Sequence, residues 1–164
     1  MKVSSRAEYG LRALIDLAAH YGEGYVRSHE IAVRQGLPES YLNQLMTSLR
    51  RAGLLRSKRG PTGGHSLSRP PAQIHLREAF DVLEEGASPW WCAEVDDPDC
   101  AYAVGCGLRP MWVAIKVAAE GVLDRLTLAD LSGPRPAARL RPAGAAPPPP
   151  ARPPAPAMRA AARK

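Results

Sequence analysis

The chain has 164 residues, a formal net charge of +6 and three cysteines. Its length suits one domain with an ordinary core and an appendage, and no apolar run is long enough to span a bilayer. The first residues lack the charged-then-apolar pattern of a secretion signal, and an odd number of cysteines argues against a disulfide framework. We therefore expect a cytoplasmic protein with reduced thiols and no membrane partner.

The charges are unevenly distributed along the chain. Residues 1–77 hold 12 basic and 5 acidic side chains, residues 78–133 hold 3 and 11, and residues 134–164 hold 7 and none. A basic first part indicates a polyanionic partner, most simply nucleic acid. The acidic middle part would be repelled by that partner, so we expect it to face away or to serve another role.

The first predicted element is a helix over residues 5–21, which Ser4 or Ser5 can cap and the glycines at 22 and 24 end. Apolar residues recur there at spacings of three and four, which indicates one buried face. This face comprises Tyr9, Ala13, Leu14, Leu17, Ala18 and Tyr21.

Two further helices, over residues 29–35 and 39–52, are separated by a short turn that contains Gly36. Ser28 is the expected cap of the first, and Pro38 suits the first turn of the second. This arrangement is typical of a helix-turn-helix. The exposed side chains expected on the second helix are Glu39, Ser40, Tyr41, Asn43 and Gln44 in its first half and Arg50 and Arg51 at its end.

A basic hairpin follows, with strands over residues 54–59 and 65–68 and a glycine-rich turn between them. A basic hairpin directly after a helix-turn-helix is a wing. Residues 74–85 are then predicted to form an amphipathic helix, and residues 86–107 a loop that holds every cysteine.

The longest helical pattern covers residues 108–126. A helix with so wide an apolar stripe at the edge of a small domain usually packs against a partner helix, so we expect a homodimer. After it, residues 134–164 hold ten of the seventeen prolines and are expected to be disordered. This tail either adds non-specific attraction to DNA or only solubilises the chain.

The cysteines are Cys92, Cys100 and Cys106, at a C-x7-C-x5-C spacing. Thiolates that converge on one point can hold an iron–sulfur cluster. The alternatives are three cysteines with unrelated roles or a thiol switch without metal. Zinc is a weaker candidate, because a structural zinc site needs four nitrogen or sulfur ligands and the chain has three thiols. The histidines show no ligand spacing and are interpreted as surface or wing residues. No nucleophile–base pair or phosphate-binding glycine loop is present, so we do not expect an enzyme.

Three segments, residues 3–14, 37–45 and 59–67, together with three cysteines before a long final helix, resemble the IscR/NsrR-type (Rrf two) family of winged-helix regulators. The resemblance covers about residues 1–131. It implies a homodimeric bacterial transcription factor, usually a repressor, that binds double-stranded promoter DNA. Many members carry an iron–sulfur cluster on three cysteines of this loop, and oxidation, nitrosylation or loss of the cluster alters their DNA binding.

The resemblance also implies roles for individual residues. Ser40, Tyr41 and Asn43 are expected at base edges or nearby phosphates in the major groove, and Lys58 and Arg59 at the minor groove. The remaining DNA-binding residues implied are Ser28, Glu39, Gln44, Arg50 and Arg51. For each one, an ordinary solvated side chain is the alternative.

The fourth cluster ligand varies within the family. Members with a histidine just beyond the last cysteine use it, but here residues 107–110 contain none. Other members use a carboxylate of the first helix, which can come from the partner subunit, and Glu8 stands at that position. The alternative for Glu8 is an ion pair with Arg12, four residues later.

We thus predict a mainly α fold with a small β-wing, a winged helix-turn-helix plus a long C-terminal dimerisation helix. The parts are a DNA-binding domain over 1–75, a cysteine loop and dimerisation helix over 76–133, and a disordered tail over 134–164. The predicted function is a transcriptional regulator that responds to an iron–sulfur cluster or to redox-active cysteines. The alternatives are a cluster-free thiol switch of the same family and a metal-binding interaction protein that uses the helix-turn-helix as a scaffold.

Overall fold

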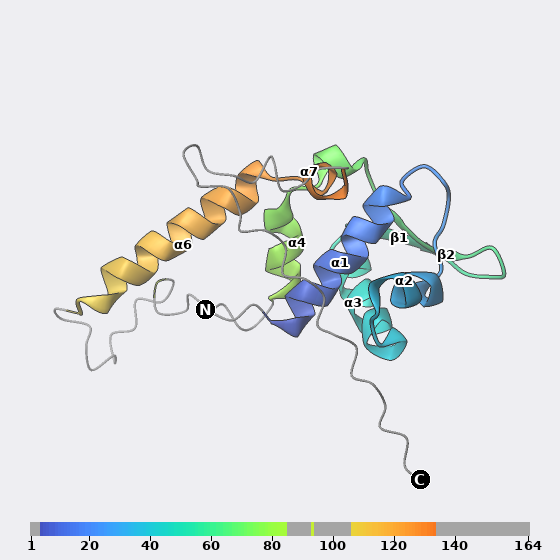
Figure 1. Ribbon diagram of the computed structural model, residues 1–164, viewed down its shortest axis with the longest axis horizontal. Helices are drawn as coiled ribbons and strands as arrows, with labels where there is room; N and C mark the ends of the chain where they lie inside the picture. The colour runs from blue at the N-terminus through green and yellow to red at the C-terminus, as the bar shows by residue number, and fades with distance from the viewer. Residues whose placement is uncertain (1–3, 85–92, 94–105, 134–164) are drawn as a thin grey trace, which may run out of the picture.

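The computed structural model describes residues 4–84, 93 and 106–133 (Figure 1). Cys92, Cys100 and the predicted tail lie outside these residues. The elements are α1 (Ser5–Ala19), α2 (Ser28–Gln35), α3 (Glu39–Arg51), β1 (Leu55–Lys58), β2 (Gly64–Leu67), a 3-10 helix η1 (Pro71–Gln73), α4 (Leu76–Leu83), α6 (Leu108–Arg125) and α7 (Leu128–Ser132). The described fold is therefore mainly α with a two-stranded antiparallel wing, which confirms the predicted class.

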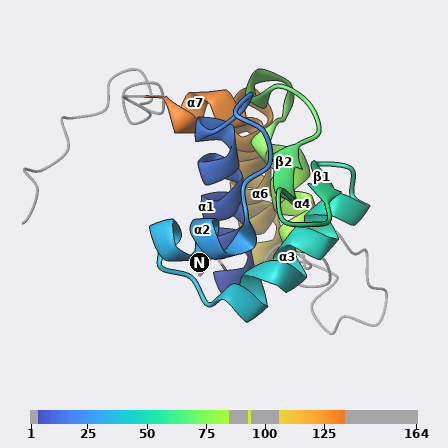
Figure 2. The ribbon, with the colours of Figure 1, turned by 90° about the vertical axis from the view of Figure 1, so that its right-hand side faces the viewer.

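Helix α1 lies in the middle of the molecule, with α2, α3 and the wing on one side and α4 and then α6 on the other (Figure 1). Figure 2 looks onto the α2, α3 and wing side, and α6 lies behind it. The core includes leucines of α1, α3 and α4 and also Leu128 of α7. Because Leu76, Ala79 and Leu83 join this core, residues on both sides of position 75 share it.

The start of α1 agrees with the prediction, and its end does not. The Ser4 Oγ accepts a hydrogen bond from the Ala7 backbone N–H at 3.0 Å, which caps the helix. The helix ends at Ala19, so Tyr21 leaves the buried face and its exposed fraction is 44%. The predicted burial of Tyr21 was wrong because the helical repeat stops two residues before it.

Helix α3 buries Leu42, Leu45 and Met46 together with Leu49, as predicted. The cap predicted for α2 was wrong. Ser28 is already the first helical residue, Arg27 precedes it, and no side chain caps the helix. The Ser28 Oγ instead lies 3.0 Å from the His65 Nε2 atom of the wing, and this contact takes the hydroxyl away from the helix start.

A buried ion pair fastens α2 to α1. The carboxylate of Asp16 is 3% exposed and accepts hydrogen bonds from Arg34 Nε at 2.9 Å and Arg34 Nη2 at 2.7 Å. Gln35 Nε2 donates a third bond at 3.1 Å. Burial alone would raise the pKa of Asp16, but these bonds and the charge of Arg34 outweigh it and hold the pKa below its ordinary value.

Replacement Asp16→Asn is expected to lower the free energy of unfolding by about 2–3 kcal/mol at pH 7, because it leaves a partly buried guanidinium without its charge partner. Since the folded-state pKa of Asp16 is depressed, its contribution is complete above the unfolded-state pKa and is lost as the pH falls below about 4. Urea unfolding at pH 7 and pH 3 checks this. The control, Asp81→Asn at a 57% exposed carboxylate, should cost under about 0.5 kcal/mol. A difference between wild type and Asp16→Asn that is independent of pH would contradict the assignment.

The wing is held against the start of α2. In the hairpin Leu55 pairs with Leu67 and Ser57 with His65, and a separate bridge joins His65 to Val26 through two backbone hydrogen bonds of 2.9 and 2.8 Å. Gly64 has a φ of +152°, and a Cβ there would lie 2.4 Å from the carbonyl oxygen of Val26. Glycine is therefore required at this position for the wing to approach α2.

The helix predicted over residues 74–85 starts later than expected. Residues Pro71–Gln73 form η1, and Ile74 is extended. Its carbonyl accepts a bond from Leu128 N at 3.0 Å, and Leu76 N donates to Leu126 O at 2.9 Å. The backbone of Ile74 is thus used in a bridge to the segment that follows α6, which is a long-range contact that helical periodicity does not reveal.

Helix α6 has the predicted extent but contributes no buried residue. Its exposed large apolar side chains, with exposed fractions of 39–62%, are Leu108, Met111, Val113, Val117 and Val122. None of the helices in the described ranges is both long enough and apolar enough to cross a membrane.

Candidate DNA-binding surface and cysteine site

One side of α3 carries exposed side chains in its first half and at its end. At 3.6 residues per turn, Glu39, Asn43 and Arg50 lie in one row, which borders the buried Met46, and Ser40 and Gln44 lie in the next row, opposite the buried leucines. All five side chains are exposed. The structure therefore places these predicted DNA-binding residues together on the side of the helix that faces away from the core.

Two predicted residues of α3 differ from this group. Tyr41 is half-buried, and its ring packs edge-on against Tyr9 of α1 with 6.0 Å between ring centroids. Arg51 is exposed but lines a shallow hollow with Ser48 and with Asp81 of α4. Tyr41 thus has a packing role that the sequence did not indicate, and Arg51 lies at the α4 end of the surface.

The wing adds positive charge beside the start of α2. Lys58 ends β1, and its Nζ lies 6.0 Å from the ring centroid of Tyr25, while Arg59 is exposed in the turn. The guanidinium of Arg27 donates to the carbonyl oxygen of Pro61 and ties the turn to the residue before α2. The wing is consequently braced against α2.

His65 is the residue of this region that sequence reasoning missed. Its Nε2 lies 3.0 Å from Ser28 Oγ and its Nδ1 lies 2.9 Å from Ser57 Oγ. Burial lowers the pKa of His65, and the charge of Arg50 lowers it further, so the ring is neutral at pH 7. The available signal was the hairpin register, which places Ser57 opposite His65, whereas the contact with Ser28 has no local signal.

Charge on this surface is mainly positive. Glu39, its predicted acidic member, has its Oε2 3.0 Å from Nδ1 of His29. The other exposed charged side chains of α3, of the wing and of the residue before α2 are cations, and this positive charge suits a polyanion such as DNA. The exposed cations are Arg27, Arg50, Arg51, Arg56, Lys58 and Arg59.

Of the predicted metal ligands, the structure describes Cys106 and Glu8. Cys106 is half-buried, carries a free thiol, and lies two residues before the first residue of α6. Glu8 is on α1, half-exposed, with its Oε1 2.7 Å from Arg12 Nη2, so within one chain the predicted alternative, the ion pair, is observed. Among the residues described, no group of three or more His, Cys, Asp or Glu side chains is arranged to hold a metal ion.

The chain segments on either side of the cysteines are anchored differently. Glu84, the last described residue before them, accepts a bond from the Ser4 Oγ at 2.6 Å at the start of α1. Cys106, on the other side, leads into α6, whose first turns point away from α1 (Figure 1). The cysteine segment therefore links the end of α4, which Glu84 joins to the start of α1, to the start of α6.

Comparison with known proteins identifies this combination of a helix-turn-helix, a wing and a long last helix. The family described as "Rrf2: Iron-dependent Transcriptional regulator" matches residues 3–134. The chain belongs to the Rrf2 family. Rrf2 proteins are transcriptional regulators and not enzymes, so the family predicted from the sequence is confirmed, and DNA binding is its common function.

Relatives within the Rrf2 family include two kinds of regulator. The HTH-type transcriptional regulator CymR of Bacillus subtilis is 39% identical over 132 residues, which cover 80% of this chain and 90% of CymR. The regulator IscR of Aliivibrio salmonicida is 33% identical over 131 residues, 80% of this chain and 77% of IscR.

Solved Rrf2 structures support the same fold. The structure of CymR, the global cysteine regulator of B. subtilis, is similar with a TM-score of 0.66 at 39% identity and covers 80% of this chain and 96% of CymR. The structure of T. potens IscR has a TM-score of 0.65 at 40% identity, with 80% and 85% covered.

Proposed function

We propose that this Rrf2 protein is a homodimeric repressor whose binding to promoter DNA responds to an iron–sulfur cluster held by Cys92, Cys100 and Cys106. One observation carries the proposal. Helix α6, which begins two residues after Cys106, buries no residue in the single chain and exposes apolar side chains along its length. A cysteine site thus adjoins the surface that a second copy of the chain would cover.

The donor set suits such a cluster. Thiolates are the usual ligands of iron–sulfur centres, and three of them leave one position for another donor. The Glu8 carboxylate is half-exposed, and its ion pair with Arg12 is of a kind that stabilises a helix by only a few tenths of a kcal/mol, about 0.3–0.5. Because α1 lies away from the start of α6 within one chain (Figure 1), Glu8 would have to come from the partner subunit. When bound, the cluster supplies a centre that oxidants alter.

The DNA-binding residues have separate roles in this proposal. Helix α3 enters the major groove, where Asn43 and Gln44 can each form two hydrogen bonds with adenine. Ser40 and Tyr41 lie near the same base pairs. Lys58 and Arg59 of the wing reach the minor groove. Ser28, Arg50 and Arg51 contact the DNA backbone near α2 and at the end of α3. Glu39, a carboxylate, can instead accept a hydrogen bond from a cytosine amino group.

The chain's own residues transmit the response. A change at Cys106 acts on the first turn of α6, and a change before residue 92 acts on Glu84 and so on the Ser4 cap of α1. Both helices contact α4. A shift of either helix alters the distance between the two α3 helices of the dimer, which must match half-sites about one helical turn apart.

A second candidate is a thiol switch without a cluster. It is favoured by the free, half-buried thiol of Cys106 beside α6. The chain is also similar to a structure of Staphylococcus aureus CymR in an oxidized form, with 35% identity and a TM-score of 0.63, and this similarity supports the thiol switch. In this case oxidation of Cys106 would act on the same first turn of α6.

Anaerobic purification of the full chain distinguishes the two. We expect a coloured protein that contains iron and acid-labile sulfide, and we expect Cys106→Ala to lose both while its far-ultraviolet circular dichroism is unchanged. The matched control Val104→Ala should keep both. If the wild-type protein were colourless and free of iron, and its DNA affinity changed on thiol oxidation, the cluster proposal would be wrong and the thiol switch would be supported. A coloured and responsive Cys106→Ala would show that Cys106 is no ligand.

A further inference from the structure

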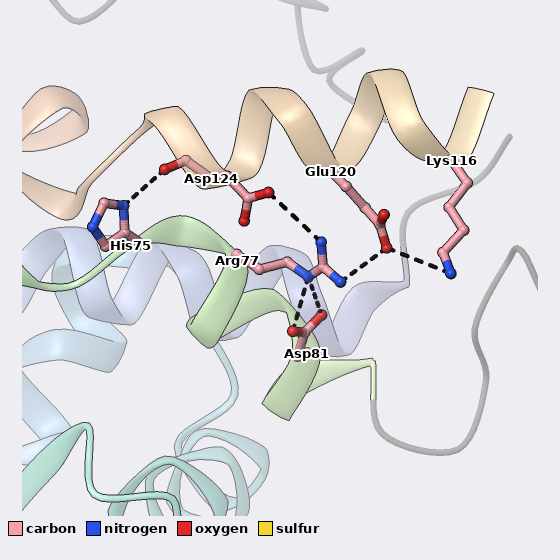
Figure 3. A network of polar contacts seen from close by, with 6 residues as sticks. All are labelled: His75, Arg77, Asp81, Lys116, Glu120 and Asp124. Carbon is pink, nitrogen blue, oxygen red and sulfur yellow. Dashed lines mark hydrogen bonds and ion pairs between the residues drawn. The ribbon is translucent and has the colours of Figure 1, made fainter. Parts of the chain in front are cut away.

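The contact between α4 and α6 is centred on one side chain, Arg77 (Figure 3). Its Nε lies 3.0 and 2.9 Å from the two carboxylate oxygens of Asp81, one turn further along α4. Its Nη2 lies 2.9 Å from Oε1 of Glu120, and its Nη1 lies 4.0 Å from Oδ2 of Asp124, both on α6. Glu120 is also 3.6 Å from Nζ of Lys116. One guanidinium therefore joins carboxylates of two helices.

The other contacts of α6 are near its C-terminal end. The backbone bridge joins residues 74–76 to residues 126–128, and the His75 Nδ1 lies 2.8 Å from the carbonyl oxygen of Asp124. In the described part of the chain, Leu123 is the α6 side chain that packs against the core. Helix α6 is thus joined to the rest of the chain at its C-terminal end, around residues 123–128, which we call the joint. Arg77 holds the part of α6 that lies before this joint, which we call the α6 arm.

The geometry of Arg77 suits it to fix a direction. Asp81 occupies the Nε side of the planar guanidinium, which orients the remaining donors towards α6 (Figure 3). Because the N–H donors of a guanidinium have fixed relative directions, they reach the carboxylates of Glu120 and Asp124 at only one angle between α4 and α6. An apolar contact of similar size would allow α6 to slide or rotate, because such contacts are not directional.

We propose that Arg77 is a positioning residue that determines which half-site spacing the dimer recognises. The proposal rests on the proposed dimer through α6. If the two α6 helices form the fixed centre of the dimer, the angle between α6 and α4 sets where each winged helix lies. Arg77 would then act on DNA recognition without contact with DNA.

The expected displacement is large enough to matter. A rotation of about 5° at the joint moves a point ~30 Å away, roughly the diameter of a small domain, by ~2–3 Å. Both subunits rotate, so the separation between the α3 helices changes by up to ~5 Å. Successive base pairs are ~3.4 Å apart, so this change exceeds one base pair.

The test compares spacing preference among variants of the full chain. Wild-type protein first selects from a pool of random DNA duplexes, and the best inverted repeat is then remade with its spacer lengthened or shortened by one base pair. We call the contacts of Arg77 with Glu120 and Asp124 the clamp. Arg77→Gln removes the α4 side of the clamp, and Glu120→Gln weakens its α6 side. Arg69→Gln is the matched control, because Arg69 is as exposed as Arg77 (33% against 32%) but pairs with Glu78 of α4.

We expect wild type and Arg69→Gln to prefer the selected spacing by about tenfold or more, and Arg77→Gln and Glu120→Gln by about threefold or less. All four should remain dimers in sedimentation. A wild-type spacing preference in both clamp variants would overturn the role of Arg77. Selection of single half-sites by the wild type would instead overturn the proposed dimer. If Arg77→Gln failed to fold, Glu120→Gln would decide the outcome alone.

Discussion

Val122→Glu is expected to convert the protein to a monomer and to lower its affinity for operator DNA by about 10²- to 10⁴-fold. Val122 is 44% exposed and lies two residues from both Glu120 and Asp124, so it is on the side of α6 opposite α4. Met111, three turns away, is on the same side. In a two-fold interface through this side, the new carboxylates meet each other in an apolar contact, which is strongly unfavourable. Sedimentation velocity and fluorescence anisotropy with operator DNA measure both effects.

The control is Val33→Glu, which adds the same charge at a 66% exposed valine of α2. This variant should remain a dimer, whatever its effect on DNA. Met111→Glu should repeat the result of Val122→Glu. If the Val122→Glu variant remained a dimer with unchanged DNA affinity, α6 would not be part of the dimer interface.

Asn43→Ala should weaken binding to the selected operator by about 1–3 kcal/mol, roughly 5- to 150-fold, and relax the preference at one or two base pairs. Asn43 is exposed in the row of α3 that faces away from the core, and the Thr47 Oγ1 donates to its carbonyl oxygen rather than to its side chain. Its amide is therefore available to a base edge. Affinities for a set of single-base operator variants, measured at one salt concentration, test the assignment.

Arg59→Ala provides the comparison, since a cation that contacts the DNA backbone or the minor groove weakens binding to all sequences more evenly. Its expected signature is a smaller dependence of affinity on salt, by about one unit of slope. If Asn43→Ala weakened all operators equally and changed the salt slope instead, Asn43 would be a phosphate contact and not a base contact.

Local patterns were sufficient for most of the described fold. The start of α1, the extents of α3 and α6, and the two strands follow from caps, periodicity and turn residues, and the structure confirms them. Two of the errors arose where a distant residue competes for a local group, whereas Tyr21 was misplaced because α1 ends two residues before it. Ser28 does not cap α2 because His65 takes its hydroxyl, and Ile74 is not helical because its backbone pairs with Leu128.

The candidate sites divide in the same way. The exposed face of α3 follows from helical spacing alone, so its residues could be named in advance. The contact of His65 with Ser28 and the clamp at Arg77 join residues 37 to 47 positions apart, and no local pattern indicates them. For the cysteines, the sequence supplied candidate donors but not their arrangement, because Cys92 and Cys100 lie outside the described residues and the proposed fourth donor, Glu8, would come from a second chain.

The packing of α7 on α1 has an evolutionary consequence. The segments before and after the α6 arm both end on the same helix, through Leu83 at Gly10 and through the buried Leu128. Residues 85–127, which comprise the cysteine segment and α6, are therefore inserted between two fixed anchor points, and loop-closure entropy grows only slowly with the length of such an insertion. Their length and donor residues can change while the operator-reading half keeps its core. One ancestral fold could in this way come to respond to different chemical signals while its DNA-binding part stays unchanged.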